Sequence, residues 1–238
     1  CGISGNILTP ENIVGVRLMS ALSTRVLGNI FNNNGLVILN SFGNIVTNNV
    51  VNGRPIVYVE NGTNLILTGA SGQVIIVKSF NITVQNSVLT HTSIGVQVRQ
   101  SNSCRILNND LSNSFESISV SDAWNTKIIG NRMVNTTYAL VFAAHVYNGI
   151  VSGNNIKNNY DGMDILNSAS NLIFGNDVES SERYGVYLYL SYENIVHHND
   201  FRNTYQVYSV NSSNIWDDGY PSGGNFWRDY SGSDHYSG

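Results

Sequence analysis

A repeat of 22 or 23 residues runs through most of this chain and limits its possible folds more than any other feature. In each repeat an asparagine is followed two positions later by an apolar residue. The apolar positions are Val88, Leu111, Met133, Ile156, Val178 and Phe201. Equivalent positions at Ile7, Ile30 and Val50 extend the pattern toward the N-terminus. A fixed period of this length is typical of solenoids, in which each repeat forms one coil that stacks on the preceding coil.

Each repeat contains three short apolar segments, and one of them alternates between small, apolar, variable and apolar residues. Examples are "GVQV" at Gly95, "GMDI" at Gly162 and "GVYL" at Gly185. Alternation with a period of two indicates strands with one face inward and one face outward. Three strands in so few residues leave no room for helical crossovers. The sequence predicts an all-β parallel solenoid of about ten coils of 20–23 residues over 1–215. An antiparallel sandwich, the alternative, does not explain the constant register.

Asparagine accounts for 36 of the 238 residues. At a coil corner, an asparagine can stack on the asparagine of the next coil and hydrogen-bond to it through the side-chain amide. We expect Asn171, Asn194 and Asn214 to form such a ladder. Asparagine and glycine at the other corners tolerate the left-handed backbone that tight turns require.

Composition argues against several classes of partner. Charged residues are 12% of the chain, the net charge is −4, and the basic residues are scattered, so we expect no nucleic-acid partner. We also expect no transmembrane segment, because no run of about 18 apolar residues occurs. Two cysteines, Cys1 and Cys104, cannot form a disulfide framework.

The register places Asp177 and Asp200 in one outward column, one coil apart. A solvated pair relieved by Arg202, a hard cation such as calcium, and a catalytic carboxylate pair are all compatible with this placement. The enzyme alternative is a polysaccharide lyase, hydrolase or epimerase that uses a face formed by Asp164, Asp177 and Asp200. Motifs of polygalacturonases and pectin lyases are not assembled in this sequence, so we favour a non-catalytic protein that requires no cofactor.

His197 and His198 are the adjacent histidines of the chain. Adjacent residues of a strand point to opposite faces, so we expect that they do not chelate one ion together. A soft copper site would also need cysteine or methionine nearby, and neither occurs in that coil or the next.

Aromatic residues concentrate in the last coils, where nine of the 13 tyrosines lie from Tyr184 onward. Flat aromatic rings suit the faces of sugars and also contacts with proteins. The predicted binding residues for a glycan or a partner protein are Tyr187, Tyr189, Tyr192 and Tyr208. The repeat places Tyr187 and Tyr208 in the outward column of Asp164, with Tyr189 and Tyr192 close by. Open solenoid ends would additionally permit head-to-tail self-association into a filament.

The segment "WDDGYPSGGNFWRDYSGSD" interrupts the coil register at Trp216. Its glycines and proline disfavour a further strand. We interpret 216–238 as a cap segment that covers the last coil. The covering residues are Trp216, Phe226, Trp227 and Tyr230, and the possible calcium ligands or turn formers are Asp217, Asp218 and Asp229.

The coil pattern together with this terminal motif resembles the NosD-like β-helix proteins, part of a broad group of carbohydrate-binding and sugar-hydrolase repeat domains. The resemblance implies a right-handed, single-stranded parallel β-helix outside the cytoplasm, of the kind found among archaeal surface proteins. The copper label of that family is not supported by soft ligands in this sequence. We therefore expect an extracellular or cell-surface scaffold or adhesion module.

Overall fold

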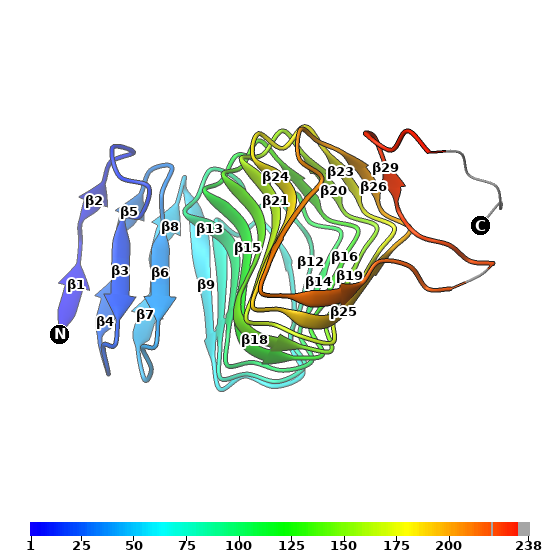
Figure 1. Cartoon of the computed structure of the whole chain (residues 1–238). Helices are drawn as coiled ribbons and strands as arrows, with labels where there is room; N and C mark the ends of the chain where they lie inside the picture. Colours follow the sequence, from blue (N-terminus) through cyan, green and yellow to red (C-terminus); the bar gives the residue numbers. More distant parts are fainter. Residues whose placement is uncertain (220, 233–238) are drawn as a thin grey trace.

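The computed structural model describes residues 1–219 and 221–232. These residues form strands and turns without a helix, and the strands stack into a parallel β-solenoid of about ten turns (Figure 1). None of them builds a helix that is long and apolar enough to cross a membrane. The predicted fold class is confirmed.

Three long sheets run along the solenoid. The first contains, in order, β2 (Ile7–Leu8), β5 (Ile30–Phe31), β8 (Val50–Val51), β9 (Arg54–Glu60), β11 (Gln73–Val77), β13 (Ile94–Arg99), β15 (Glu116–Trp124), β18 (Tyr138–Tyr147), β21 (Asp161–Leu166), β24 (Tyr184–Tyr189) and β27 (Val207–Val210). The second contains β10 (Ile66–Gly69), β12 (Thr83–Ser87), β14 (Arg105–Leu107), β16 (Lys127–Ile129), β19 (Ile150–Ser152), β22 (Leu172–Phe174), β25 (Tyr192–His197) and β28 (Ser213–Ile215). The third contains β17 (Arg132–Val134), β20 (Asn155–Lys157), β23 (Asp177–Glu179), β26 (Asp200–Arg202) and β29 (Phe226–Trp227). We call them the eleven-, eight- and five-stranded sheets.

Two smaller sheets complete the N-terminal coils. They are β1 (Gly2–Ser4) with β4 (Arg25–Leu27) and β7 (Ile45–Thr47), and β3 (Val16–Met19) with β6 (Leu36–Leu39). Among the described strands, only β8 and β9 pair in antiparallel orientation. Side chains of these coils, including Leu36 and Ile38, form a second core with Ile75 and Val77 of β11. As a result β11 is buried on both faces, and the N-terminal coils are packed firmly onto the rest of the solenoid.

The predicted apolar column forms the main core from Leu111 onward, but the earlier positions are one residue out of register. Ile7 and Ile30 are 68% and 41% exposed and Val50 is only partly buried, whereas Phe31 and Val51 are fully buried. Leu111, Met133, Ile156, Val178 and Phe201 are fully buried, as predicted. Val88 is 45% exposed, and Leu89 is buried in its place. The reason is a one-residue shift: Ser87 donates its backbone N–H to Asn109 Oδ1 at 3.0 Å and thus occupies the position that asparagine holds elsewhere.

Buried asparagines connect successive coils through side-chain ladders. The predicted ladder of Asn171, Asn194 and Asn214 is present, with each Nδ2 donating to the next Oδ1 at 2.9 and 2.8 Å. A longer ladder, spaced 2.8–3.1 Å, contains Asn109, Asn131, Asn154, Asn176, Asn199 and Asn225. Each Oδ1 also accepts the backbone N–H of the asparagine before it, as Asn154 does from Asn131 at 2.9 Å. The ladders satisfy polar groups that the corners would otherwise bury without partners.

The described part of the cap segment departs from the coil path and then returns to it. The long ladder ends on Asn225, and β29 pairs with β26, which places Trp227 opposite Phe201. These two rings stack with centroids 4.9 Å apart. The prediction that no further strand forms is therefore wrong, because Asn225 restores the corner after the irregular turn. Trp216 and Trp227 cover the core, whereas Phe226 and Tyr230 are 59% and 64% exposed and do not.

Replacement of Asn154 by alanine tests the ladder. The change removes two accepted and two donated hydrogen bonds and leaves buried partners unsatisfied, so we expect a loss of about 3 kcal/mol in the free energy of unfolding. Asn155→Ala is the matched control, because that neighbouring side chain is exposed, and it should change stability by less than about 0.5 kcal/mol. Urea unfolding of both variants measures the difference; equal effects would contradict a structural role for the ladder.

Candidate functional site

Asp164, Tyr187 and Tyr208 occupy one outward column of the eleven-stranded sheet. Asp164 of β21 lies opposite Tyr187 of β24, which lies opposite Tyr208 of β27. This is the column that the repeat predicts. Tyr189 ends β24, whereas Tyr192 begins β25 and belongs to the eight-stranded sheet.

Aromatic rings around this column form a continuous surface, which we call the tyrosine face and define as Tyr184, Tyr187, Tyr189, Tyr205 and Tyr208. The ring of Tyr208 stacks on Tyr184 at 4.8 Å and on Tyr187 at 5.8 Å. The guanidinium of Arg183 lies 5.0 Å from the centre of the Tyr184 ring. The sequence pattern did not single out Tyr184 or Arg183, although Tyr184 lies 23 residues after Asp161 and is its register partner.

Two aspartates lie buried beside the tyrosine face. Asp161 is 1% exposed and pairs with Arg183, whose Nε donates to Asp161 Oδ1 at 2.9 Å. Asp164 is 7% exposed, and its Oδ1 has no hydrogen-bond partner. Burial, followed by the negative charge of Asp161, raises the pKa of Asp164 to about 7. Glu116, which is partly buried, has its pKa raised chiefly by loss of solvent.

Asp177 and Asp200 lie in the five-stranded sheet, so they do not share a face with Asp164. The proposed three-aspartate face is therefore wrong, because Asp164 belongs to a different strand of the coil. Asp177 and Asp200 are register partners, as predicted. Lys157 Nζ lies 2.6 Å from Asp177, and Arg202 Nη2 lies 2.8 Å from Asp177 and 3.3 Å from Asp200. These cations relieve the expected repulsion.

The pKa of Asp177 reflects this ion-pair network. Burial alone would raise its pKa, but hydrogen bonds and charges from Lys157 and Arg202 outweigh burial and hold it below its ordinary value. An ionised, paired carboxylate of this type is typical of a solvated ladder rather than of a general acid.

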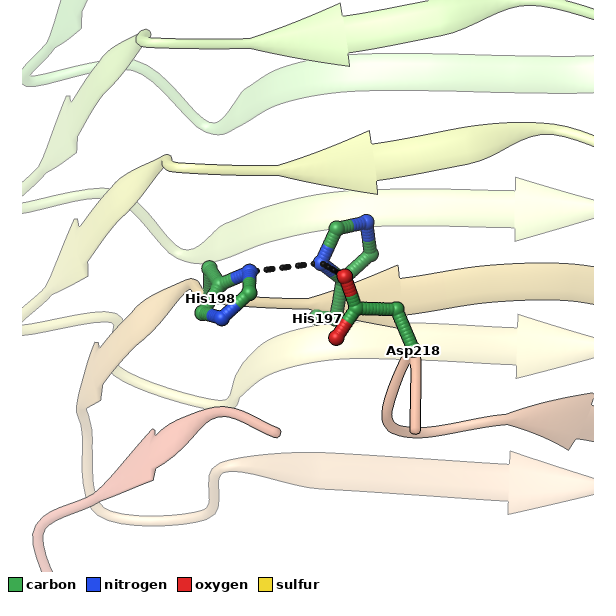
Figure 2. Close-up of side chains that lie close together, drawn as sticks. All are labelled: His197, His198 and Asp218. Atoms are coloured by element: carbon green, nitrogen blue, oxygen red, sulfur yellow. Dashed lines mark hydrogen bonds and ion pairs between the residues drawn. The ribbon is translucent and has the colours of Figure 1, made fainter. Parts of the chain in front are cut away.

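A second cluster of polar side chains lies where the cap segment meets the last complete coil, and Figure 2 shows His197, His198 and Asp218 there. The Nδ1 atoms of His197 and His198 are 2.7 Å apart, and Asp218 Oδ2 lies 3.4 Å from His197 Nδ1. The expectation that the two histidines point to opposite faces is wrong. His198 follows the end of β25 with φ of 51°, so the alternation of an extended strand no longer applies to it.

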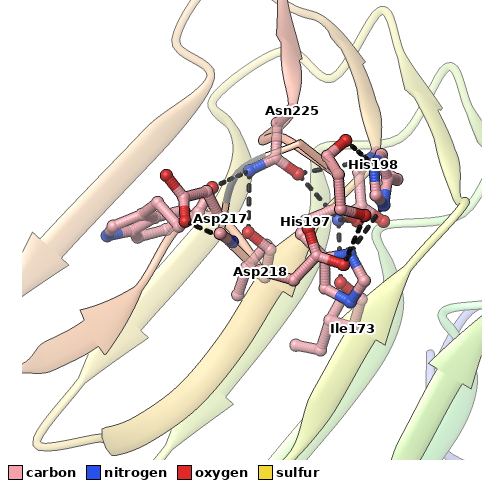
Figure 3. Close-up of polar contacts among 11 residues, drawn as sticks. Ile173, His197, His198, Asp217, Asp218 and Asn225 are labelled. Atoms are coloured by element: carbon pink, nitrogen blue, oxygen red, sulfur yellow. Dashed lines mark hydrogen bonds and ion pairs between the residues drawn. The ribbon is translucent and has the colours of Figure 1, made fainter. Parts of the chain in front are cut away.

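Backbone and side-chain contacts hold the cap segment against this cluster (Figure 3). The backbone N–H of His198 donates to Gly224 O at 2.7 Å, and Asn225 Nδ2 donates to Val196 O at 2.8 Å. Ser222 Oγ donates to Asp218 Oδ2 at 2.8 Å. The pKa of Asp218 is lowered by this hydrogen bond and by the two nearby imidazoles.

The three aspartates predicted as calcium ligands have different surroundings. Asp217 Oδ1 accepts the backbone N–H of Gly219 at 2.8 Å and acts as a turn former. Asp229 is exposed near the opening beside Trp216 and Trp227. Within 1–219 and 221–232, the one group of three side chains spaced for an ion is His197, His198 and Asp218.

Comparison with known proteins supports the fold. Residues 62–232 match the family described as "Periplasmic copper-binding protein (NosD)". No curated protein matches the chain. The tailspike protein of the E. coli bacteriophage HK620, solved in complex with a hexasaccharide, has a TM-score of 0.53 at 14% identity and covers 83% of this chain and 47% of its own. The chain thus spans about half the length of that tailspike.

Two other solved structures have lower TM-scores. The periplasmic alginate epimerase AlgG has a TM-score of 0.45 at 16% identity, covering 83% of this chain and 57% of its own. The surface protein and adhesin PfbA of Streptococcus pneumoniae has a TM-score of 0.46 at 12% identity, covering 90% of this chain and 81% of its own. Such distant likenesses concern the fold alone.

Replacement of Asp164 by asparagine, with the free energy of unfolding measured by denaturation over a series of pH values, tests whether the pKa of Asp164 is raised in the folded protein. The pKa rises from an ordinary 3.8 to about 7 in the folded protein, so the folded state binds a proton more tightly than the unfolded chain. The wild type therefore loses stability as pH rises between these values. Relative to wild type, Asp164→Asn should gain up to roughly 3–4 kcal/mol at pH of about 8 and nothing below pH of about 4.

Asp177→Asn is the control of opposite sign in the same denaturation series. The pKa of Asp177 is lowered in the folded protein, so its contribution is present at neutral pH and disappears as pH falls. This variant should therefore be less stable than wild type at neutral pH, and the difference should vanish in acid. Identical pH profiles for the two variants would refute the assignment.

Proposed function

The chain belongs to the NosD family, and from this premise we propose that it is a non-catalytic extracytoplasmic β-helix module that binds a neutral glycan on the tyrosine face. The observation that carries the proposal is the continuous group of stacked tyrosine rings on the last coils of the eleven-stranded sheet. The periplasmic description of the family supports a location outside the cytoplasm.

The chemistry of the tyrosine face matches the surface of a sugar. Aromatic rings pack against the apolar C–H faces of a sugar ring, while phenol hydroxyls at the ring edges form hydrogen bonds with its hydroxyl groups. Tyr205 and Tyr208 are 61% and 47% exposed, so their rings are accessible to a ligand. Arg183 is already paired with Asp161 and contributes little net positive charge, which favours a neutral glycan over an acidic one.

The solenoid supports such a surface by rigidity. β24, which carries three of the tyrosines, pairs with β21 on one side and with β27 on the other, and β27 is the last strand of the sheet. The inward residues of β24, Val186 and Leu188, are fully buried. A tyrosine side chain has few rotatable bonds, so it loses little conformational entropy on binding. The rings are therefore held in place before a ligand arrives, which lowers the cost of binding. The tailspike bound to a hexasaccharide is a precedent for glycan binding by a solenoid of this fold.

A polysaccharide-active enzyme is the second candidate, and the raised pKa of Asp164 favours it. A carboxylic acid with a pKa near neutrality can exchange a proton with substrate at neutral pH. Asp161 and Arg183, which lie beside it, would then orient a sugar. The three-aspartate arrangement plays no part in this version.

Glycan binding is tested with the double variant Tyr187→Ala/Tyr208→Ala. We expect wild type to bind neutral oligosaccharides on a glycan array, and the double variant to bind at least tenfold more weakly in calorimetry, because two contact rings are lost. Tyr230→Ala is the control, since that exposed tyrosine lies outside the tyrosine face. Failure of wild type to bind any neutral glycan, or equal losses in both variants, would contradict the proposal; binding of a protein partner instead would favour adhesion.

The absence of catalysis is tested by incubation of wild type with neutral and acidic polysaccharides. We expect no new reducing ends, no unsaturated products and no change in sugar configuration. Products that form with wild type and with Asp200→Asn but not with Asp164→Asn would establish the enzyme alternative. Asp200 is suitable for comparison because its carboxylate lies in the Arg202 network of another sheet.

A further inference from the structure

We propose that His197, His198 and Asp218 bind one divalent transition-metal ion, which fastens the irregular turn of the cap segment to the last complete coil. The three potential ligand atoms, one from each side chain, all lie within 4.8 Å of one another (Figure 2). His197 is the last residue of β25 and His198 follows it, whereas Asp218 comes from the part of the cap segment, 216–219 and 221–224, where the coil register is interrupted.

The backbone at His198 makes this cluster possible. In an extended strand, the side chains of neighbouring residues diverge to opposite faces. With φ of 51°, His198 instead turns its ring beside that of His197. An ion between imidazoles prefers metal–nitrogen distances of about 2.0–2.1 Å and therefore donor atoms about 3.3 Å apart. The Nδ1 atoms are 2.7 Å apart, so a small rotation of the exposed His198 ring accommodates the ion.

Surrounding contacts select the nitrogen that faces the cluster. His198 Nε2 lies 2.7 Å from the carbonyl oxygen of Ser222, which can only accept a hydrogen bond. The proton of a neutral His198 ring is therefore on Nε2, and its Nδ1 lone pair points toward His197 and Asp218. An imidazole N–H that donates to a backbone carbonyl while the other nitrogen stays available is the usual arrangement around metal-binding histidines.

The other two ligands are also held in place. The ring of His197 stacks on Phe174 with centroids 5.6 Å apart and an interplanar angle of 13°. The Asp218 carboxylate accepts a hydrogen bond from Ser222 Oγ at 2.8 Å. Each of the three candidate ligands thus has a supporting contact outside the cluster, and two of those contacts come from Ser222.

The donor set identifies the class of ion. Two imidazole nitrogens and one carboxylate oxygen suit Zn²⁺, Ni²⁺ or Cu²⁺, with remaining positions for water. Calcium prefers six to eight oxygen ligands, so it does not match. Cu⁺ prefers thiolate or thioether sulfur, and the sequence has no cysteine or methionine after Met163. The family is described as copper-binding, and of the two oxidation states of copper these residues suit Cu²⁺ rather than Cu⁺.

The position of the cluster gives the ion a structural role. This part of the cap segment, 216–219 and 221–224, is joined to the coil by the bond from His198 N–H to Gly224 O and by the final step of the asparagine ladder. A metal bound by residues on both sides adds a cross-link at this junction. Metal binding to the folded state alone also raises stability by mass action.

The experiment titrates the full chain with ZnSO₄, NiCl₂, CuSO₄ and CaCl₂ in separate calorimetric runs. We expect one Zn²⁺, Ni²⁺ or Cu²⁺ per chain with micromolar or tighter affinity, and no binding of Ca²⁺ at the cluster. With Cu²⁺, electron paramagnetic resonance should show coupling to imidazole nitrogen. Bound metal should raise the melting temperature and slow protease cleavage within 216–224.

His198→Asn is the decisive variant, since asparagine adopts positive φ at many corners of this chain and should preserve the fold. We expect its affinity for Zn²⁺ to fall at least tenfold, and that of Asp218→Asn to fall as well. His145→Asn is the matched control, because His145 has φ of 52° and contacts one carboxylate, Asp122, at 2.9 Å. Asp217→Asn is the control for the adjacent carboxylate.

Both controls should bind like wild type. The proposal is overturned if wild type binds none of the three transition-metal ions stoichiometrically, or if His198→Asn retains wild-type affinity. It is equally overturned if His145→Asn loses as much affinity as His198→Asn, or if Ca²⁺ binds through the same residues while Zn²⁺ does not.

Discussion

The stacking of buried asparagine amides is the interaction on which this solenoid depends. A coil corner turns the backbone sharply and removes peptide groups from water, where an unpaired N–H or C=O is costly. An asparagine side chain both donates and accepts, so it satisfies the corner of its own coil and binds the next one. The ladder from Asn109 to Asn225 repeats this solution without interruption. Because each step joins residues in adjacent coils, it also holds the coils in register.

Because the register between coils is constant, the spacing of residues in the sequence determines which side chains are neighbours on the surface. Residues 21 to 23 positions apart become neighbours about one strand spacing apart, so side chains of one kind accumulate in a column. In the eleven-stranded sheet this places Asp164 above Tyr187 and Tyr208. In the five-stranded sheet it places Asp177 and Asp200 beside Lys157 and Arg202. The same rule therefore produces an aromatic binding surface on one sheet and a compensated charge ladder on another.

The local environment then separates carboxylates that the sequence pattern treats alike. Asp164 is buried near Asp161, and its pKa is raised, whereas Asp177 accepts hydrogen bonds from two cations, and its pKa is lowered. The cap segment also departs locally from the regular coil. It leaves the coil path at Trp216 and returns at Asn225, and the intervening turn brings Asp218 to two histidines of the preceding coil.

By itself the sequence determined the solenoid, the length of its coils, the ladder through Asn171, and the column from Asp164 to Tyr208. These features follow from periodicity, because a residue's face and coil depend only on its place in the repeat. Tertiary structure alone decided the shift that buries Leu89 instead of Val88, the second core under the N-terminal coils, and the meeting of His197, His198 and Asp218. The second core depends on packing between distant segments, and the cluster depends on the irregular turn that carries Asp218 to His198. The positive φ of His198 itself lies at the periodic corner that Gly153 and Gly175 occupy in earlier coils, but a repeat pattern contains no information about how an irregular turn folds.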